Sequence, residues 1–212
     1  MTITCRHCGR THEAATYGII NAAQNPELKA ALKDGRLALD ECPHCGRKSP
    51  MRYEMIYHDP AEKFMLMLCS DERSALKANM IVSSTEGLED YRLRLVNSFG
   101  EMIEKVNIFD SGLDDIVVEF CKYAAKLDMQ ETMKGDPRLE DAMTADFKFL
   151  RTDGADNAMT LAYPSKGRME MVEVPFSLYE NCRSIVERNP ALRDNAKGFA
   201  RVDADWLSSF IK

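Results

Sequence analysis

The 212-residue sequence lacks several features that would assign it to a functional class. Its longest apolar run, Phe64–Cys69, is far too short to span a bilayer, which excludes a membrane-spanning helix. The start MTITCRHC has no basic segment followed by an apolar one, so we predict no secretory signal and expect a cytoplasmic protein. It contains neither a glycine-rich phosphate loop nor a Gly-x-Ser-x-Gly nucleophile motif, which argues against the enzymes that depend on them.

Positive charge is also scarce. Lysine and arginine number 28 against 34 aspartate and glutamate residues, a net charge of −6. This balance disfavours a chain built to neutralise phosphates, although a local basic patch remains possible. The contents of 45 % hydrophobic and 29 % charged residues are those of a globular protein, so disordered and fibrous classes are excluded.

Alternating apolar residues predict a β-hairpin in the first half of the chain. Residues 51–58 have the period of a strand with one buried face. Residues 58–62 favour a turn, and Phe64–Leu68 is expected to return as the second strand. Before this hairpin, residues 25–35 predict a short helix.

The middle of the chain predicts two helices. Apolar residues recur at helical spacing from Leu88 to Ile103 and again from Leu113 to Ala124, with a break at residues 110–112. We expect residues 88–125 to form a helical hairpin packed against the strands, because its apolar stripe is wider than a coiled-coil seam. Three further strands and a helix are predicted at residues 146–151, 158–163, 169–174 and 176–186.

Four of the seven cysteines form the strongest chemical signal. They occur as two CxxCG motifs, Cys5–Cys8 and Cys42–Cys45, separated by 33 residues. Each motif points two sulfur atoms at one place, and four thiolates form a tetrahedral, soft site that suits zinc. We therefore predict one structural zinc ion per chain, bound by Cys5, Cys8, Cys42 and Cys45. The alternative is two local redox pairs or adventitious thiols.

Other residues carry weaker signals. His7 and His44 are expected to point away from the metal, and His58–Asp59 favours a turn over an acid–base pair. Buried small hydrophobic side chains are predicted at Cys69, Cys121 and Cys182. Solvated or capping acids, in preference to a cation site, are predicted at Glu86, Glu89, Asp90, Asp110, Asp114 and Asp115. We predict no catalytic residue.

Five segments together resemble the CpXC family of bacterial and archaeal proteins. They are CRHCG at 5–9, NPELKAALKDG at 25–35, CPHCG at 42–46, YHDPAEKF at 57–64 and RLVNSFGEMIEKVNIFDSGLDD at 94–115. The chain departs from the family pattern in three ways: the first cysteine pair lacks a proline, Cys69 stands where a proline is expected, and the part beyond about residue 130 matches only loosely. The resemblance implies a zinc-binding fold, the four cysteines as ligands and a bacterial source, and it lends no activity.

These observations predict an α+β fold in two parts. Residues 1–128 would form a CpXC-like zinc-binding domain, with a zinc-ribbon-like β lobe and a helical hairpin. Residues 129–212 would form a C-terminal α+β region, a small antiparallel sheet plus a helix.

The leading functional hypothesis is a non-enzymatic binding module. Zinc would clamp a small lobe that lacks enough core of its own, and the surface would recruit a macromolecular partner, a protein in preference to a nucleic acid. A basic cluster either forms a face for RNA or DNA or offsets the thiolate charge; it comprises Arg6, Arg10, Arg47, Lys48 and Arg52. The alternatives are a redox switch, in which the cysteine pairs oxidise and release the metal, and an enzyme with a site outside the zinc.

Overall fold

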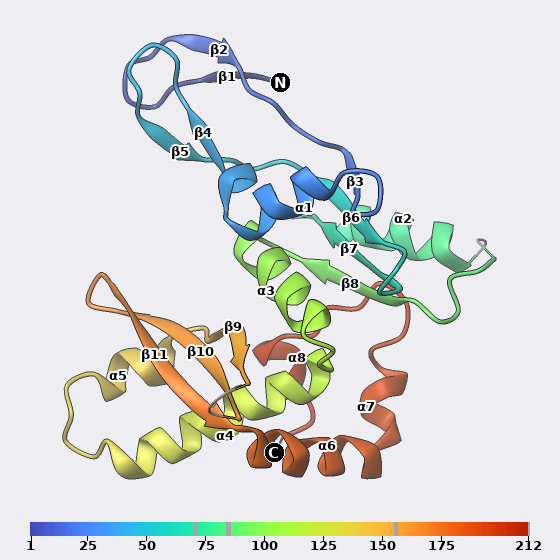
Figure 1. Cartoon of the computed structure of the whole chain (residues 1–212), viewed down its shortest axis with the longest axis vertical. Helices are drawn as coiled ribbons and strands as arrows, with labels where there is room; N and C mark the ends of the chain where they lie inside the picture. Colours follow the sequence, from blue (N-terminus) through green and yellow to red (C-terminus); the bar gives the residue numbers. More distant parts are fainter. Residues whose placement is uncertain (70–71, 84–85, 155–156, 212) are drawn as a thin grey trace. The chain divides into compact units, whose positions relative to one another are not determined.

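The computed structural model describes residues 1–69, 72–83, 86–154 and 157–211 and divides the chain into two compact units. The first unit is Met1–Ile103 and the second is Glu104–Lys212, so the division falls within one helix. The boundary predicted between residues 128 and 129 marks the end of the family resemblance, whereas this division marks two compact units. The predicted boundary stays a prediction. Figure 1 shows the elements of each unit along the colour gradient.

The elements of the first unit are mostly short strands. They are β1 Thr2–Thr4, β2 Thr11–Glu13, β3 Ile19–Asn21, α1 Pro26–Lys33, the 3₁₀ turn η1 Arg36–Ala38, β4 Leu39–Glu41, β5 Lys48–Pro50, β6 Met55–Asp59, β7 Phe64–Leu68, α2 Glu72–Ser83 and β8 Arg92–Val96, followed by α3 Phe99–Asp110, which continues into the second unit.

A four-stranded sheet with the order β3-β6-β7-β8 forms the core of the first unit. The strands β6 and β7 pair antiparallel, with Met55 opposite Leu68 and Asp59 opposite Phe64. Both strands alternate between buried and half-buried residues, which confirms the predicted hairpin with one apolar face. The first of these strands begins at Met55, four residues later than predicted.

The prediction of a helix from Leu88 was wrong over its first part. Residues 92–96 form β8, which pairs in parallel with β7. The sequence there reads Arg-Leu-Arg-Leu-Val, an alternation that suits a strand, and both Leu93 and Leu95 are buried. Helical spacing and strand alternation overlap in this segment, and pairing with β7 decides between them.

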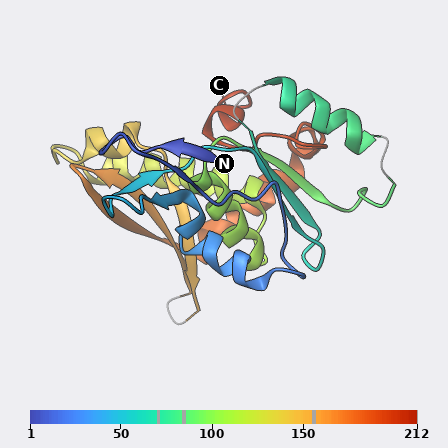
Figure 2. The same cartoon turned by 90° about the horizontal axis from the view of Figure 1, so that it is seen from above.

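Two small hairpins, β1–β2 and β4–β5, lie side by side in both views of the molecule (Figures 1 and 2). Each strand has three residues, too few for a stable isolated sheet. In the segments that contain these hairpins, residues 1–18 and 36–52, only Cys5, Ala14, Cys42 and Met51 are buried. We call these two segments the cysteine lobe. Its own apolar core is too small to hold it together.

The second unit contains the rest of α3 and a three-stranded antiparallel sheet with the order β11-β10-β9. Its elements are α4 Asp115–Thr132, α5 Leu139–Thr144, β9 Lys148–Asp153, β10 Ala158–Ser165, β11 Arg168–Pro175, α6 Phe176–Arg188, α7 Pro190–Asp194 and α8 Ala204–Ser208. The central helix α4 contacts α5, α6 and α8. The predicted small sheet and following helix are both present, so the α+β class is confirmed.

The predicted break between two helices is present, because α3 ends at Asp110 and α4 begins at Asp115; the packing of both helices against the strands stays a prediction. Gly112 has a φ of +69° at the break, and Asp114 caps α4 by accepting a hydrogen bond from the Ile116 N–H at 2.9 Å. Lys105 and Asp115 join the two helices through a buried ion pair of 2.8 Å. No helix in the described ranges is long and apolar enough to cross a membrane.

Candidate metal centre

The two CxxCG motifs form equivalent turns at the tips of the small hairpins. Cys5 directly follows β1, and Cys42 directly follows β4. In the first turn the Gly9 N–H donates to the Cys5 carbonyl oxygen at 2.9 Å; in the second the Gly46 N–H donates to the Cys42 carbonyl oxygen at 2.8 Å. These glycines have φ angles of +71° and +67°, which a side chain would strain. The sequence CxxCG therefore folds locally into a turn with two converging cysteines.

The four sulfur atoms lie within 4.8 Å of one another. The Cys5 and Cys45 Sγ atoms are 3.7 Å apart, and the Cys8 and Cys42 Sγ atoms are 3.8 Å apart, so each contact joins one hairpin to the other. Sulfur atoms bound at about 2.3 Å in a tetrahedron would be about 3.8 Å apart, whereas a disulfide brings them to about 2.0 Å. The arrangement therefore fits one metal ion held by both pairs, and all four cysteines are free thiols.

The electrostatics of the quartet also favour a cation. Backbone N–H groups of Cys8 and His7 donate to the Cys5 sulfur and lower the pKa of this thiol to about 6. The Arg47 N–H acts in the same direction on Cys45, but burial and the three neighbouring sulfurs outweigh it and raise the pKa of Cys45 to about 11. Crowded thiolates repel one another, so full ionisation needs a positive charge at their centre. A divalent metal ion supplies that charge.

The centre has a closed side and an open side. Cys5 and Cys42 are buried, at 5 % and 1 % exposure, whereas Cys8 and Cys45 are exposed. Each hairpin thus contributes one inner and one outer sulfur. The outer pair is the part of the site that solvent reaches.

A histidine and an aspartate join the hairpins beside the sulfur atoms. The His12 Nε2 atom in β2 lies 2.8 Å from the Asp40 carboxylate in β4, within hydrogen-bond distance, and the two side chains are 6 % and 11 % exposed. His44 contacts the other hairpin at the Thr11 carbonyl oxygen, 3.3 Å away, and lies outside the sulfur quartet. No sequence pattern indicates His12 and Asp40, because only the side-by-side placement of two distant hairpins brings them together.

The structure gives His58 and Asp59 structural partners. The His58 Nε2 atom lies 3.2 Å from the Tyr91 hydroxyl. Asp59 is the last residue of β6, only 3 % exposed, and it accepts a hydrogen bond from the Lys29 ammonium at 2.9 Å. The turn thus begins at Pro60, two residues later than predicted, and Asp59 contributes more than a local turn bond.

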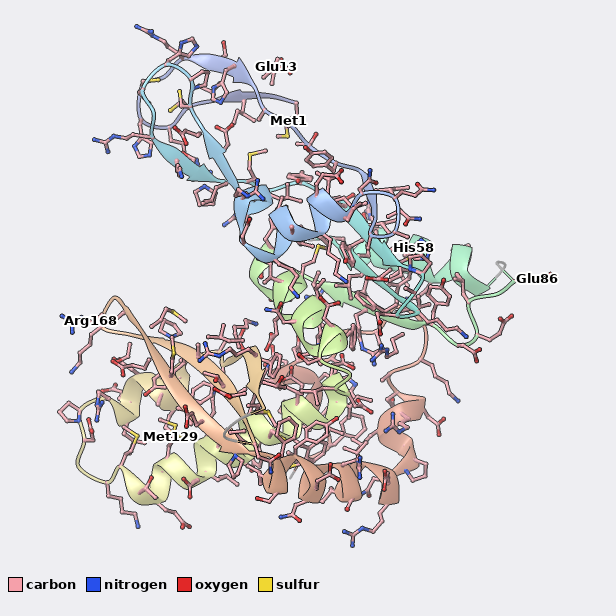
Figure 3. All side chains as sticks on the ribbon, in the orientation of Figure 1. Met1, Glu13, His58, Glu86, Met129 and Arg168 are labelled. Atoms are coloured by element: carbon pink, nitrogen blue, oxygen red, sulfur yellow. The ribbon has the colours of Figure 1, made fainter. Side chains whose placement is uncertain are left out.

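The candidate acidic cation site is not assembled in the described part of the chain, where the four cysteines are the only metal-ligating group. Asp114 and Asp115 are instead a helix cap and a buried ion-pair partner, as described above. Glu86 lies in the segment between α2 and β8 of the first unit (Figure 3), whereas Asp110 ends α3 in the second unit. The acids predicted as candidates are therefore spread over several elements.

The remaining cysteines are buried, as predicted. Cys69, Cys121 and Cys182 are 1 %, 0 % and 3 % exposed. Cys121 in α4 and Cys182 in α6 are close enough to interact: the Cys182 thiol, followed by burial, raises the pKa of Cys121. The sequence signal for this pair is only that both residues occupy apolar helix positions.

The comparison with protein families agrees with the geometry of the site. The family model described as CpXC protein matches residues 3–122, more than half of the chain. No curated protein matches the chain, and no solved structure matches it. The matched segment contains both cysteine pairs, and the structure brings all four of their sulfur atoms together. The chain therefore belongs to the CpXC family.

Proposed function

We propose that this protein is a non-enzymatic module in which one structural zinc ion stabilises the cysteine lobe for binding to a macromolecular partner, a protein in preference to a nucleic acid. The observation that carries the proposal is the quartet of sulfur atoms at tetrahedral spacing, two from each hairpin. Cys5, Cys8, Cys42 and Cys45 would hold the zinc. Four thiolates fill its coordination shell and leave no position for water or substrate, which is the arrangement of a structural site.

The small core of the lobe explains why a metal is needed. Its strands have three residues each, and the buried side chains are few. The hairpins are linked by the sulfur quartet, by the His12–Asp40 pair and by the contact of His44 with the Thr11 carbonyl oxygen. Zinc would supply a cross-link between segments 33 residues apart, which offsets the entropy of ordering them. Seven free thiols suit a reducing compartment, and we place the protein in the cytoplasm.

The surface of the lobe supports a role in recognition. Arg6, Arg10, Arg47 and Lys48 are exposed around the two turns. Lys48 lies 3.8 Å from Glu41, whereas none of the three arginines forms an ion pair with another described residue. A zinc ion with four thiolates carries two negative charges, which these side chains partly offset. The remaining positive charge would suit an acidic segment of a protein partner.

Metal content tests the zinc part of the proposal. We expect the purified protein to hold about one zinc ion per chain by elemental analysis, and Cys8→Ala with Cys45→Ala to lose it. A matched control is Cys182→Ala, which we expect to keep the metal. A folded wild-type lobe without metal would contradict the assignment. Iron in its place would not, because four thiolates also bind iron.

A charge variant tests the partner. Replacing Arg6, Arg10 and Arg47 with glutamine should remove binding to whatever co-purifies with the tagged wild-type protein from its host, while the zinc content stays the same. Replacing the exposed Arg168, Arg183 and Arg188 with glutamine provides the control. If the bound partner is instead nuclease-sensitive and its affinity falls steeply with salt, it is a nucleic acid. Equal partner binding by both variants would contradict the proposed surface.

The exposed outer cysteines favour one alternative function, a redox switch. Peroxide would take two electrons from two thiolates, form one S–S bond and be reduced to water, after which the remaining thiolates could not hold the metal tightly. Cys8 and Cys45 are the accessible members of the quartet. A zinc-sensitive dye distinguishes the two functions: release of one zinc per chain at low peroxide, reversed by a thiol reductant, supports the switch, whereas retention of the zinc supports the structural module.

A further inference from the structure

The second unit contains a buried network of charged side chains that no part of the proposed function uses. Glu104 and Lys105 in α3 and Asp115, Glu119 and Lys122 in α4 are each at most 6 % exposed. Lys122 lies 2.6 Å from Glu104 and 2.8 Å from Glu119, and Lys105 lies 2.8 Å from Asp115. Lys148 lies 3.3 Å from Glu104 and 2.5 Å from the exposed Asp146. Every charged group of the network therefore has a partner of opposite sign.

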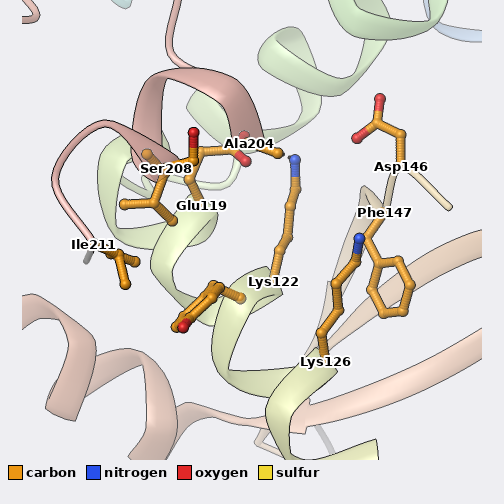
Figure 4. Close-up of a pocket in the computed structure, with 10 residues that line it drawn as sticks. Glu119, Lys122, Lys126, Asp146, Phe147, Ala204, Ser208 and Ile211 are labelled. Carbon is orange, nitrogen blue, oxygen red and sulfur yellow. Dashed lines mark hydrogen bonds and ion pairs between the residues drawn. The ribbon is translucent and has the colours of Figure 1, made fainter. Parts of the chain in front are cut away.

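A cavity of about 270 Å³ lies against this network (Figure 4). Its size is close to the lower end of the range for small-molecule sites, about 300–1,000 Å³. Glu119 and Lys122 form one part of its lining, and the rest is mostly apolar. The apolar walls come from α4, from the start of the sheet and from the C-terminal segment: Tyr123, Phe147, Ala204, Leu207 and Ile211.

Lys126 is the cation in this cavity that has no carboxylate partner among the described residues. Its ammonium group donates to the carbonyl oxygens of Ala145 and Met143, at 2.6 and 3.4 Å, and lies 5.2 Å from the centre of the Phe147 ring. An ammonium group has three N–H donors, so one donor is left for a ligand. Burial and the neighbouring Lys122 lower the pKa of Lys126, whereas Asp146 opposes this change.

We propose that this cavity binds a small amphipathic monocarboxylate, with the carboxylate at Lys126 and the apolar part against Leu207 and Ile211. The other charged groups in the lining are already paired: Lys122 with two glutamates, and Asp146 with Lys148 at 2.5 Å. A positive ligand would meet Lys126 in an apolar setting, and a ligand with several negative charges would meet Glu119 and Asp146. One negative charge on an apolar body fits both the cation and the walls.

Titration calorimetry with octanoate on the full-length, metal-loaded protein tests this site, with 1-octanol as the neutral probe of matched chain length. We expect saturable binding of octanoate at a single site and binding of 1-octanol that is about tenfold weaker or more. The only tryptophan, Trp206, lies in α8 together with three residues of the lining, so its fluorescence should report the same binding curve.

Two variants locate the binding event. Lys126→Gln keeps the length of the side chain but removes its charge, and we expect it to weaken octanoate binding about tenfold to a hundredfold while 1-octanol binding stays the same. Ala204→Phe, at an exposed position of the lining, should fill the cavity and abolish binding of both probes. Lys134→Gln, on the exposed surface of the same unit, should bind octanoate as the wild type does.

Three results would overturn the proposal. They are the absence of saturable octanoate binding to the wild type, equal affinity for octanoate and 1-octanol, and unchanged octanoate affinity in Lys126→Gln. Thermal unfolding of each variant shows that it is folded, so loss of binding can be assigned to the site. If Lys126→Gln fails to fold, Ala204→Phe and the comparison of the two probes still decide.

Discussion

Cys42 and Cys121 are both fully buried cysteines, but their surroundings differ. Cys42 contacts the sulfur of Cys8 from the other hairpin, whereas Cys121 lies in α4 close to the thiol of Cys182. We predict that Cys42→Ala lowers the free energy of unfolding by on the order of 3 kcal/mol or more and releases the metal, because a lost ligand couples metal loss to unfolding. Cys121→Ala should lose about 1–2 kcal/mol, as for a small cavity, and keep the metal.

Denaturant unfolding with parallel metal analysis checks this pair of variants. Similar losses of stability in the two, or full metal content in Cys42→Ala, would contradict the role of Cys42. The comparison is matched because each change removes one buried sulfur atom from the chain.

Asp59 contributes more to stability than its place near a hairpin turn indicates. As a turn residue, its side chain would contribute at most about 1 kcal/mol to the free energy of unfolding. In the structure its carboxylate also accepts hydrogen bonds from Tyr57 and from the Glu62 N–H, besides the Lys29 ammonium. Burial alone would raise the pKa of Asp59, but the Lys29 ammonium and the backbone N–H groups of Glu62 and Ala61 lower it overall.

We therefore predict that Asp59→Asn lowers the free energy of unfolding by about 1–3 kcal/mol at neutral pH. Because the pKa of Asp59 is lower in the folded state than in the unfolded state, its stabilisation is present above about pH 4 and is lost as the pH falls further. The variant should thus show a flatter dependence of stability on pH in this acid range, measured by denaturant unfolding. A parallel curve for the wild type and Asp59→Asn would contradict this ion-pair assignment.

At the scale of elements, sequence patterns predicted those turns, strands and helices that are formed by residues close together in the chain. The CxxCG turns and the strand alternation of β6 and β7 are such local features, and so is the helical spacing in α4. The strand β8 was missed because its pairing with β7 is distant in sequence, and β3 because its three residues gain their order from a parallel partner. The contact between His12 and Asp40 was missed for the same reason.

The charged residues of α3 and α4 posed a different problem. Glu104, Lys105, Glu119 and Lys122 occur between apolar positions, and charged side chains are usually placed on the solvated face of a helix. Here each of them is buried with a partner of opposite charge. Only the crossing of two helices brings these charges together, so the network and the cavity beside it could not be predicted from helical periodicity.

The apolar face of α4 gives a prediction at this scale. Val117 is completely buried, whereas Leu127 on the same helix is 45 % exposed. We predict that Val117→Asp unfolds the second unit or makes the protein insoluble, because an unpaired buried charge is very unfavourable, whereas Leu127→Asp changes the free energy of unfolding by at most about 0.5 kcal/mol. Circular dichroism and size-exclusion chromatography check both variants. A folded, monomeric Val117→Asp variant from a dimeric parent would show that this face is an assembly surface.

For the whole molecule, the two compact units depend on different forces. The second unit has the apolar core around α4 and β10, a strand in which almost every residue is buried. In the first unit, the sheet β3-β6-β7-β8 has an apolar core of its own, whereas the cysteine lobe has few buried side chains and would depend on the proposed metal ion. Removal of the metal should therefore unfold the cysteine lobe and leave the rest of the chain folded.

Hydrogen exchange before and after treatment with a strong zinc chelator tests this division. We predict that amide protection is lost in β1, β2, β4 and β5, because these strands have little else to stabilise them. Protection in β6, β7 and β10 should remain within a few-fold of its initial value, since their hydrogen bonds are supported by buried apolar side chains. Adding zinc back should restore the pattern, and Cys42→Ala should resemble the chelated wild type without any chelator. Unchanged protection in the small hairpins would show that the lobe is stable without metal, and loss of protection in β10 as well would show that the metal supports the entire chain.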